Sequence, residues 1–212
     1  EMDAEGKKIL ASLRASHKKI TDGVKTFPRQ ASFTGDKVIS SYTEFCLVTQ
    51  YLDLEQQEDA HFKRLGSILK EFPIYTAFLE GVKGVGPAMA GVIISEIDIS
   101  KANYPSSLWK YAGLDCAPDG KGRSRRQEHL VEVPYTDKNG EEKVRKGITF
   151  NPFLKTKLLG VLATSFLRAG PGKYRQVYDD YKNRLEHHPS WLEASKGHKH
   201  NASLRYMVKI FL

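Results

Sequence analysis

The segment from residue 78 to residue 94 constrains the fold more than any other part of the sequence. Gly84 and Gly86 flank one apolar residue, and glycine adopts a tight corner without strain. Pro87 suits the first turn of a helix that follows such a corner. The small residues after it would let two helices approach closely: Ala88, Ala90 and Gly91. The segment therefore predicts an apolar helix and a second helix that meet at a glycine corner.

This corner resembles the helix-hairpin-helix motif, which holds a nucleic-acid backbone without reading its sequence. The amides of Gly86 and Ala88 would lie at the positive end of the second helix, where a phosphate is favoured. Lys83 stands beside the corner as a further phosphate contact. We expect Lys83, Gly84, Gly86 and Ala88 to bind nucleic acid. The alternative is a purely structural corner between packed helices.

The charge of the chain is unevenly distributed. Residues 1–100 carry 12 Lys and Arg against 14 Asp and Glu, whereas residues 101–212 carry 21 against 11. A net charge of −2 in one half and +10 in the other indicates a polyanionic partner for the second half, although a merely basic surface would give the same count. No apolar run reaches the roughly 20 residues of a membrane helix.

The location expected from the sequence is cytoplasmic and nucleoid-associated. Cys46 and Cys116 are isolated, and isolated cysteines fit a reducing compartment better than a disulfide framework. Four histidines near the C-terminus, at 187, 188, 198 and 200, match no zinc-finger spacing, so no metal site is expected. Residues 198–200 read as a loop or a nucleic-acid contact before a final helix capped by Asn201. The tyrosines of this region are expected to pack in the core.

The periodicity predicts a mainly α chain with one inserted β-hairpin. A helical, coiled-coil-like arm over residues 1–72 contains a helix at 3–22 and a long helix from an Asp36 cap to about residue 70. An antiparallel hairpin or a dimerising coiled coil would both produce this pattern, and we expect a homodimer or higher oligomer. A compact domain follows over residues 73–212. Its expected elements are a short helix at 105–113, strands at 129–133 and 143–145, and helices from Asn151, at 174–187 and from Asn201.

The loop at residues 116–127 concentrates positive charge. It reads as flexible and glycine-containing, and four of its basic residues fall within six positions: Lys121, Arg123, Arg125 and Arg126. Such a loop can follow a phosphate backbone, and a solvated loop is the alternative. Lys155, on the helix after Asn151, is expected to join the same basic face.

Several blocks in order along the chain resemble one family. They are Gly84-Val85-Gly86-Pro87, residues 94–97, Trp109 to Leu114, the Gly/Arg-rich loop, residues 146–148 with Asn151, residues 154–158, and the final segment 201–212. Together they resemble the C-terminal domain of the DEDD-type insertion-sequence transposases, the bridge-RNA-guided recombinases. The likeness covers about residues 75–212, and residues 1–72 resemble the helical linker of that family.

The resemblance implies a domain of a mobile-element transposase that binds DNA and a structured guide RNA during DNA recombination. In that family a RuvC-like domain holds Mg²⁺ on four acidic residues. The chain has no such domain, so we expect a fragment without cofactor that binds DNA but does not recombine it alone.

The same resemblance implies a serine nucleophile in the loop after the Ala-Gly-Leu block. Ser124 is the serine of that loop, but it comes about three positions late and lacks the usual following glycine. Neighbouring guanidinium groups would bind the scissile phosphate. The alternatives are a basic loop in which Ser124 is filler, a non-catalytic structure-specific DNA-binding or repair module, and a dimerisation piece with incidental charge.

Overall fold

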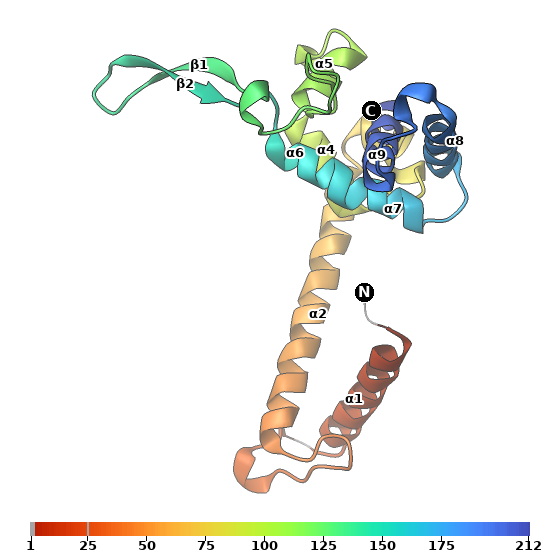
Figure 1. The fold of residues 1–212 in the computed structure, drawn as a ribbon. Coiled ribbons are helices and arrows are strands. Elements are labelled where there is room, and N and C mark those ends of the chain that lie inside the picture. The colour runs from red at the N-terminus through yellow and green to blue at the C-terminus, as the bar shows by residue number, and fades with distance from the viewer. Residues whose placement is uncertain (1–2, 25) are drawn as a thin grey trace. The chain divides into compact units, whose positions relative to one another are not determined.

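The computed structural model describes residues 3–24 and 26–212, and within them the chain is mainly helical with one antiparallel strand pair (Figure 1). This confirms the predicted fold class. The chain divides into two compact units, residues 1–64 and residues 65–212. None of the described helices is both long enough and apolar enough to cross a membrane.

The first unit is an antiparallel pair of helices within one chain. Arg14 of the first helix binds Glu55 of the second at 2.5 Å, and the His17 ring nitrogen lies 2.8 Å from the Thr49 hydroxyl. Residue numbers therefore increase along the first helix where those of its contacts decrease along the second, so the two helices run antiparallel. This is the hairpin, one of the two arrangements that the sequence left open. The elements of the unit are α1 (Ala4–Asp22), η1 (Gln30–Ser32) and the greater part of α2 (Tyr42–Leu69).

The sequence predicted that the long helix begins at an Asp36 cap, but α2 begins at Tyr42. The Asp36 carboxylate accepts the amide of Ile39 at 2.9 Å and so closes a turn before the helix. Ser41 and Glu44 cap α2 reciprocally: the Ser41 hydroxyl accepts the Glu44 amide, and the Glu44 carboxylate accepts the Ser41 amide. The Ser-x-x-Glu spacing was visible in the sequence.

The second unit is built around one long helix from Pro152 to Arg168. The helix starts after Asn151, as predicted, and Asn151 caps it by accepting the Leu154 amide at 3.0 Å. Its segments are α6 (Pro152–Thr156), the π-helical turn η5 (Lys157–Leu162) and α7 (Ala163–Arg168). Its inner stripe is buried at Leu154, Leu158, Leu162 and Phe166. Val161 is 49% exposed, because the wider π-helical turn keeps a spacing of four residues on the buried face.

Short elements precede this helix and supply the rest of the core together with the end of α2. Leu69, Leu79, Ala90 and Ile93 pack in the same buried cluster as the long helix. The elements are α3 (Pro73–Ala77), η2 (Leu79–Gly81), α4 (Pro87–Glu96), η3 (Ile99–Lys101), α5 (Pro105–Tyr111) and η4 (Gln127–His129).

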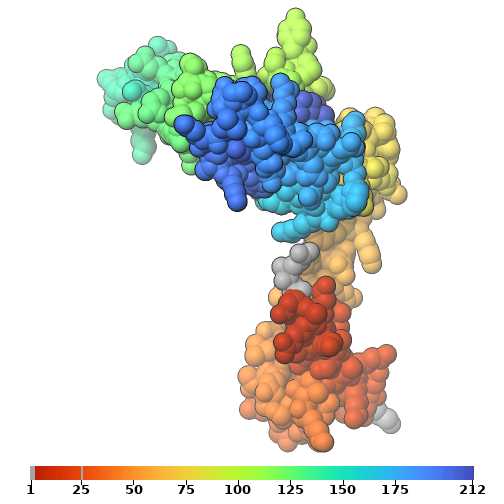
Figure 2. All heavy atoms as spheres, turned by 45° about the vertical axis from the view of Figure 1, so that its right-hand side comes forward, coloured from red at the N-terminus to blue at the C-terminus, as the bar shows by residue number. Residues whose placement is uncertain are grey.

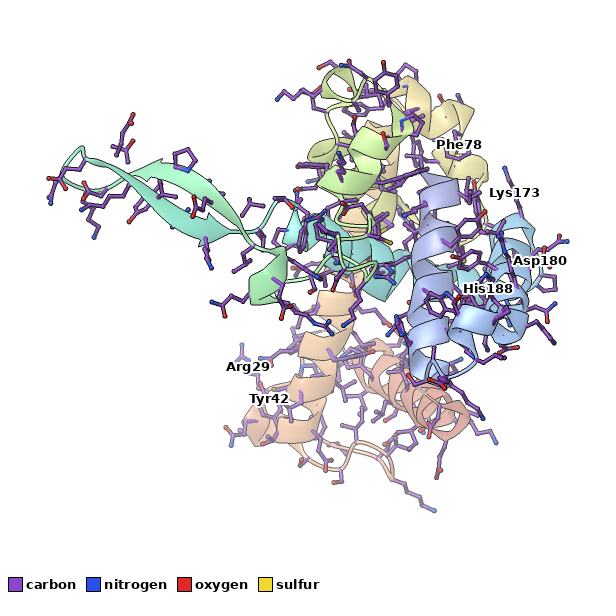
Figure 3. All side chains as sticks on the ribbon, turned by 45° about the horizontal axis from the view of Figure 1, so that its top comes forward. Arg29, Tyr42, Phe78, Lys173, Asp180 and His188 are labelled. Carbon is purple, nitrogen blue, oxygen red and sulfur yellow. The ribbon has the colours of Figure 1, made fainter. Side chains whose placement is uncertain are left out.

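The hairpin predicted after the basic loop is confirmed as β1 (Val131–Thr136) and β2 (Glu142–Gly147). Gly140, with φ of 84°, provides the turn between them. The strands extend away from the rest of the second unit with side chains exposed on both sides (Figure 3). His129, predicted to lie on the first strand, instead belongs to η4 and is only 3% exposed.

Two helices complete the second unit, α8 (Lys173–His187) and α9 (Lys196–Phe211), with the short turn η6 (Pro189–Trp191) between them. They lie side by side and form one continuous face in Figure 2. The Tyr181 and Tyr206 rings stack at 4.0 Å, and the Tyr178 hydroxyl lies 2.6 Å from His200 Nδ1. Tyr174 and Tyr178 are buried, as predicted, whereas Tyr206 is 37% exposed and stacks on Tyr181 at the surface instead of in the core.

The final helix begins earlier than predicted. Ser195, and not Asn201, caps α9, because its hydroxyl accepts the His198 amide at 3.2 Å. Residues 198–200, expected in a loop, are therefore helical. Asn201 and Arg205, four residues apart, lie on the same face of α9.

Candidate phosphodiester-binding site

The basic loop after α5 is held by its own backbone hydrogen bonds, in contrast to the flexible loop that the sequence predicted. The Ala117 amide donates to the Lys121 carbonyl at 2.8 Å, and the Arg123 amide donates to the Asp115 carbonyl at 3.1 Å. Gly120, with φ of 74°, makes the turn between these paired segments. The loop thus presents the next residue, Ser124, from a braced backbone.

Arg123 also braces this loop through its side chain. Its Nε atom donates to both Asp115 carboxylate oxygens at 2.9 and 3.0 Å, and a terminal nitrogen approaches the same carboxylate at 2.8 Å. The hydrogen bonds that Arg123 donates to Asp115 raise the pKa of Arg123 above its usual range. One edge of the guanidinium is therefore occupied, which limits its capacity to bind a phosphate bidentately.

A cavity of about 790 Å³ adjoins the braced loop. Five of the residues predicted to form the site line it: Lys121, Arg123, Ser124, Arg126 and Lys155. The cap residue Ser195 and one side of α9 form another wall, to which α9 contributes Gly197, His198, Asn201 and Arg205. No Asp or Glu is among the described residues that line this cavity. We call it the basic cavity; its charge and the adjoining helix N-terminus both favour an anion.

Arg205 is a cation of the basic cavity that sequence reasoning missed. Its guanidinium lies over Gly122, so closely that a Cβ atom at position 122 would coincide with a terminal nitrogen. Within the described part of the chain, no carboxylate forms an ion pair with it. Asn201 and Arg205 are four residues apart, so the sequence could have placed them on one face of a helix. The sequence predicted, however, that the helix begins only at Asn201.

Lys155 also lines the basic cavity. Its Nζ atom donates to the Arg123 carbonyl and sits 4.6 Å from the centre of the Phe150 ring. Burial, and then the positive charge of Arg205, lower the pKa of Lys155 below its usual value. A bound anion would offset both effects by favouring the charged lysine.

Ser124 forms a chain of polar contacts with two residues that the sequence did not identify. Its Oγ atom lies 2.9 Å from His129 Nδ1, and His129 Nε2 lies 3.1 Å from a carboxylate oxygen of Asp119. The Lys121 amide donates to Asp119, and this bond, followed by the contact with His129, lowers the pKa of Asp119. A hydroxyl, an imidazole and a carboxylate in this order are the groups of an activated nucleophile. The five-residue separation of Ser124 and His129 gave no recognisable motif.

The glycine corner forms a second surface. Gly84, with φ of 101°, packs against α7, where Ser165 Oγ donates to its carbonyl at 2.7 Å. Lys83, Gly86 and Ala88 are exposed on the other side of the corner. The helix before the corner is not continuous as predicted, because α3 ends at Ala77 and a 3-10 turn follows.

The two surfaces lie near opposite ends of the long helix. Lys155 contacts the loop of the basic cavity, whereas Ser165 contacts the corner, and ten residues of helix span about 15 Å. Lys83 lines a different cavity of about 440 Å³ together with Phe78 and Lys173, which are labelled in Figure 3. Arg125 is exposed and lines neither cavity.

Metal ligands do not gather at either surface: over residues 3–24 and 26–212, no group of three or more His, Cys, Asp or Glu side chains is placed to hold an ion. Asp115 and Asp119, the carboxylates of the loop, are engaged by Arg123 and His129.

No family model, curated protein or solved structure matches this chain. The case for function therefore depends on the chemistry of these residues.

Proposed function

We propose that this chain binds the phosphodiester backbone of DNA in the basic cavity. As the C-terminal domain of an insertion-sequence transposase, it would contribute Ser124 as the nucleophile of strand cleavage and exchange. One observation carries the proposal: the cavity gathers cations without a carboxylate among its lining residues, and the Ser124 hydroxyl belongs to its wall.

The electrostatics favour a phosphate over a neutral ligand. Lys121, Arg126 and Arg205 offer donors, and Lys155 adds a charge that its burial makes costly unless an anion lies near it. The first amides of α9 add the positive end of a helix. None of these groups selects a particular base, so sequence specificity would come from elsewhere. A structured guide RNA, which has the same backbone chemistry, is a second partner of this surface.

The glycine corner would provide a separate backbone contact. Gly86 has no side chain to cap α4, and the space beside its Cα is open. A phosphate can therefore approach the first amides of α4, with Lys83 beside it. Because the corner and the basic cavity lie near opposite ends of the long helix, they would hold different phosphates.

Salt-dependent binding of this chain to duplex and branched DNA tests the proposal. Each phosphate contact contributes about 0.9 to the slope of log affinity against log salt. Lys121→Ala and Arg126→Ala should each lower that slope by about 0.9. Lys138→Ala, in the turn of the hairpin, is the matched control and should leave the slope unchanged. Slopes that stay the same in the cavity variants would refute this binding site.

A non-catalytic, structure-specific DNA-binding module is the second candidate, and the open face of the glycine corner favours it. A nicked DNA substrate separates the two when it is given to a transposase that contains this chain. Nucleophilic attack would leave a covalent phosphoserine adduct at Ser124, and Ser124→Ala would abolish it. DNA binding without any adduct from the wild-type protein would support the binding module.

Dimerisation through the first unit is also part of the proposal. Leu47, Tyr51 and Leu54 of α2 are 61%, 44% and 66% exposed, and their spacing places them along one side of the helix. A second copy would cover this stripe. We expect sedimentation velocity to show a dimer that Leu47→Ser with Leu54→Ser converts to a monomer. A wild-type monomer at high micromolar concentration would rule out this interface.

A further inference from the structure

We propose that His129 is the general base that removes the proton of Ser124, and that Asp119 is the positioning residue that orients His129. This inference deepens the proposed function and rests on it, because it assigns the activation of the nucleophile to the protein's own side chains. It stands on the order Ser124, His129, Asp119 and on the two contacts that join them, at 2.9 and 3.1 Å.

The backbone fixes which nitrogen of His129 carries the proton. The Ser124 amide points at Nδ1 from 3.1 Å, and an amide can only donate, so Nδ1 is the acceptor. The proton of the neutral ring therefore lies on Nε2 and is donated to Asp119. In this tautomer the two donors of Ser124, its amide and its hydroxyl, share the single lone pair of Nδ1.

A third residue, Arg126, also orients the hydroxyl of Ser124. The Arg126 amide donates to Ser124 Oγ at 3.3 Å, so one lone pair of the oxygen is occupied and its hydrogen remains for His129. His129 is 3% exposed, whereas Ser124 is half-buried and lines the basic cavity. The imidazole is thus shielded from bulk water while its partner faces the space proposed for phosphate.

The reaction step balances within these groups. Ser124 Oγ attacks the phosphorus, and its proton passes to His129 Nδ1. The P–Oγ bond forms as a P–O ester bond of the backbone breaks. The leaving oxygen takes the bonding electron pair and receives the proton from the imidazolium. Protonation of Nδ1 costs the hydrogen bond from the Ser124 amide, and the Asp119 carboxylate offsets this cost by stabilising the positive ring.

A fluorophosphonate probe tests the inference on this chain without DNA. Ser124 would attack the phosphorus, fluoride would leave, and the labelled peptide would be identified by mass spectrometry. We expect Ser124→Ala to abolish labelling and His129→Gln to slow it by about 100-fold or more. Asp119→Asn, which keeps the histidine, should slow it by about tenfold or more. His61→Gln, on α2 in the first unit, is the matched control and should label at the wild-type rate.

The pH profile provides a readout that a structural role would not move. A rate that needs an unprotonated base rises with pH, so we expect the wild-type labelling rate to rise with pH and the His129→Gln rate to lose this dependence. The charged groups nearest this site are Asp119 on the loop and the cations of the basic cavity: Lys121, Arg123, Arg126, Lys155 and Arg205. His198 also lines this cavity, so His198→Gln, which should keep the wild-type pH dependence, is the control for the second histidine.

The outcomes separate this inference from the proposed function. An unlabelled wild-type serine, or equal rates in wild type, His129→Gln and Asp119→Asn, would overturn it. If His129→Gln fails to fold, as circular dichroism would show, the Asp119→Asn rate and the wild-type pH profile decide. DNA affinity is measured on the same proteins. If His129→Gln and Asp119→Asn keep both the DNA affinity and the labelling rate of wild type, only the role of His129 as general base is refuted. If the wild-type protein does not bind DNA, the proposed function is refuted.

Discussion

Gly122→Ala should weaken DNA binding without weakening the fold. The new methyl group would occupy the position of the Arg205 guanidinium and force it out of the basic cavity. The backbone itself tolerates the change, because Gly122 is not among the glycines with positive φ. The obstructing atoms are the far end of a flexible side chain, so Arg205 can rotate away. We expect the free energy of unfolding to stay within about 1 kcal/mol of wild type.

The loss of affinity follows from one phosphate contact. A contact that contributes 0.9 to the salt slope, and nothing at 1 M salt, is worth about eightfold in affinity at 0.1 M salt. Fluorescence anisotropy on labelled duplex DNA, measured over a salt series, gives both the affinity and the slope. Arg205→Ala should show the same loss. The double variant should lose no more than either single one, because both changes remove the same contact.

Gly197→Ala is the matched control for this prediction. Gly197 lines the same cavity on α9, and no atom lies within 4 Å of the position that its Cβ would take. DNA affinity should therefore remain at the wild-type value. The reasoning fails if Gly122→Ala binds as tightly as Gly197→Ala, or if the losses from Gly122→Ala and Arg205→Ala add fully.

Three further predictions concern stability. Gly84→Ala should destabilise the chain by about 2–4 kcal/mol in urea unfolding, because a side chain is strained at φ of 101° and meets an aromatic ring at 2.9 Å; a cost below that of Gly86→Ala would contradict this. Arg123→Ala should cost about 2 kcal/mol in the same assay by leaving Asp115 unpaired, and an unchanged urea midpoint would count against the brace. Hydrogen bonds from the Ser40 hydroxyl and nearby amides lower the pKa of Glu44. Its contribution to stability is thus present above the unfolded value of about 4.3 and lost as pH falls through the folded value. Glu44→Gln should flatten that part of the melting-temperature profile between pH 6 and 3, and an unaltered profile would argue against the cap.

Local chemistry made much of the fold predictable from the sequence. Asn151 followed by Pro152 marked a helix start because a cap acceptor and a fixed φ both act within one turn. The turn at Gly140 marked the hairpin for the same reason. The start of α2 was misplaced although its signal was also local: Asp36 is a good cap residue, but Ser41 and Glu44 supply a reciprocal pair that Asp36 lacks.

The candidate site depends on contacts that no local pattern encodes. Arg205 reaches the loop only because α9 packs beside the long helix, so its proximity to Gly122 is a tertiary property. His129 looked like one member of an alternating strand, and the turn of η4 placed it inward instead. Composition predicted a basic loop. It could not predict that one edge of the Arg123 guanidinium binds the Asp115 carboxylate. Nor could it predict that Arg205 has no carboxylate partner among the residues that the structure describes.

The bracing of the loop and the exposure of its cations serve one physical requirement. A nucleophile gains from a fixed position because less entropy remains to be lost when the substrate binds. In this chain Arg123 and the backbone pairing hold the loop, which would leave Lys121, Arg126 and Arg205 to meet the proposed phosphate. A loop whose every arginine faced solvent would attract DNA equally well but would not hold Ser124 against His129. If Ser124 is the nucleophile that we propose, the internal ion pair is the feature that would distinguish a prepared reaction site from a basic surface.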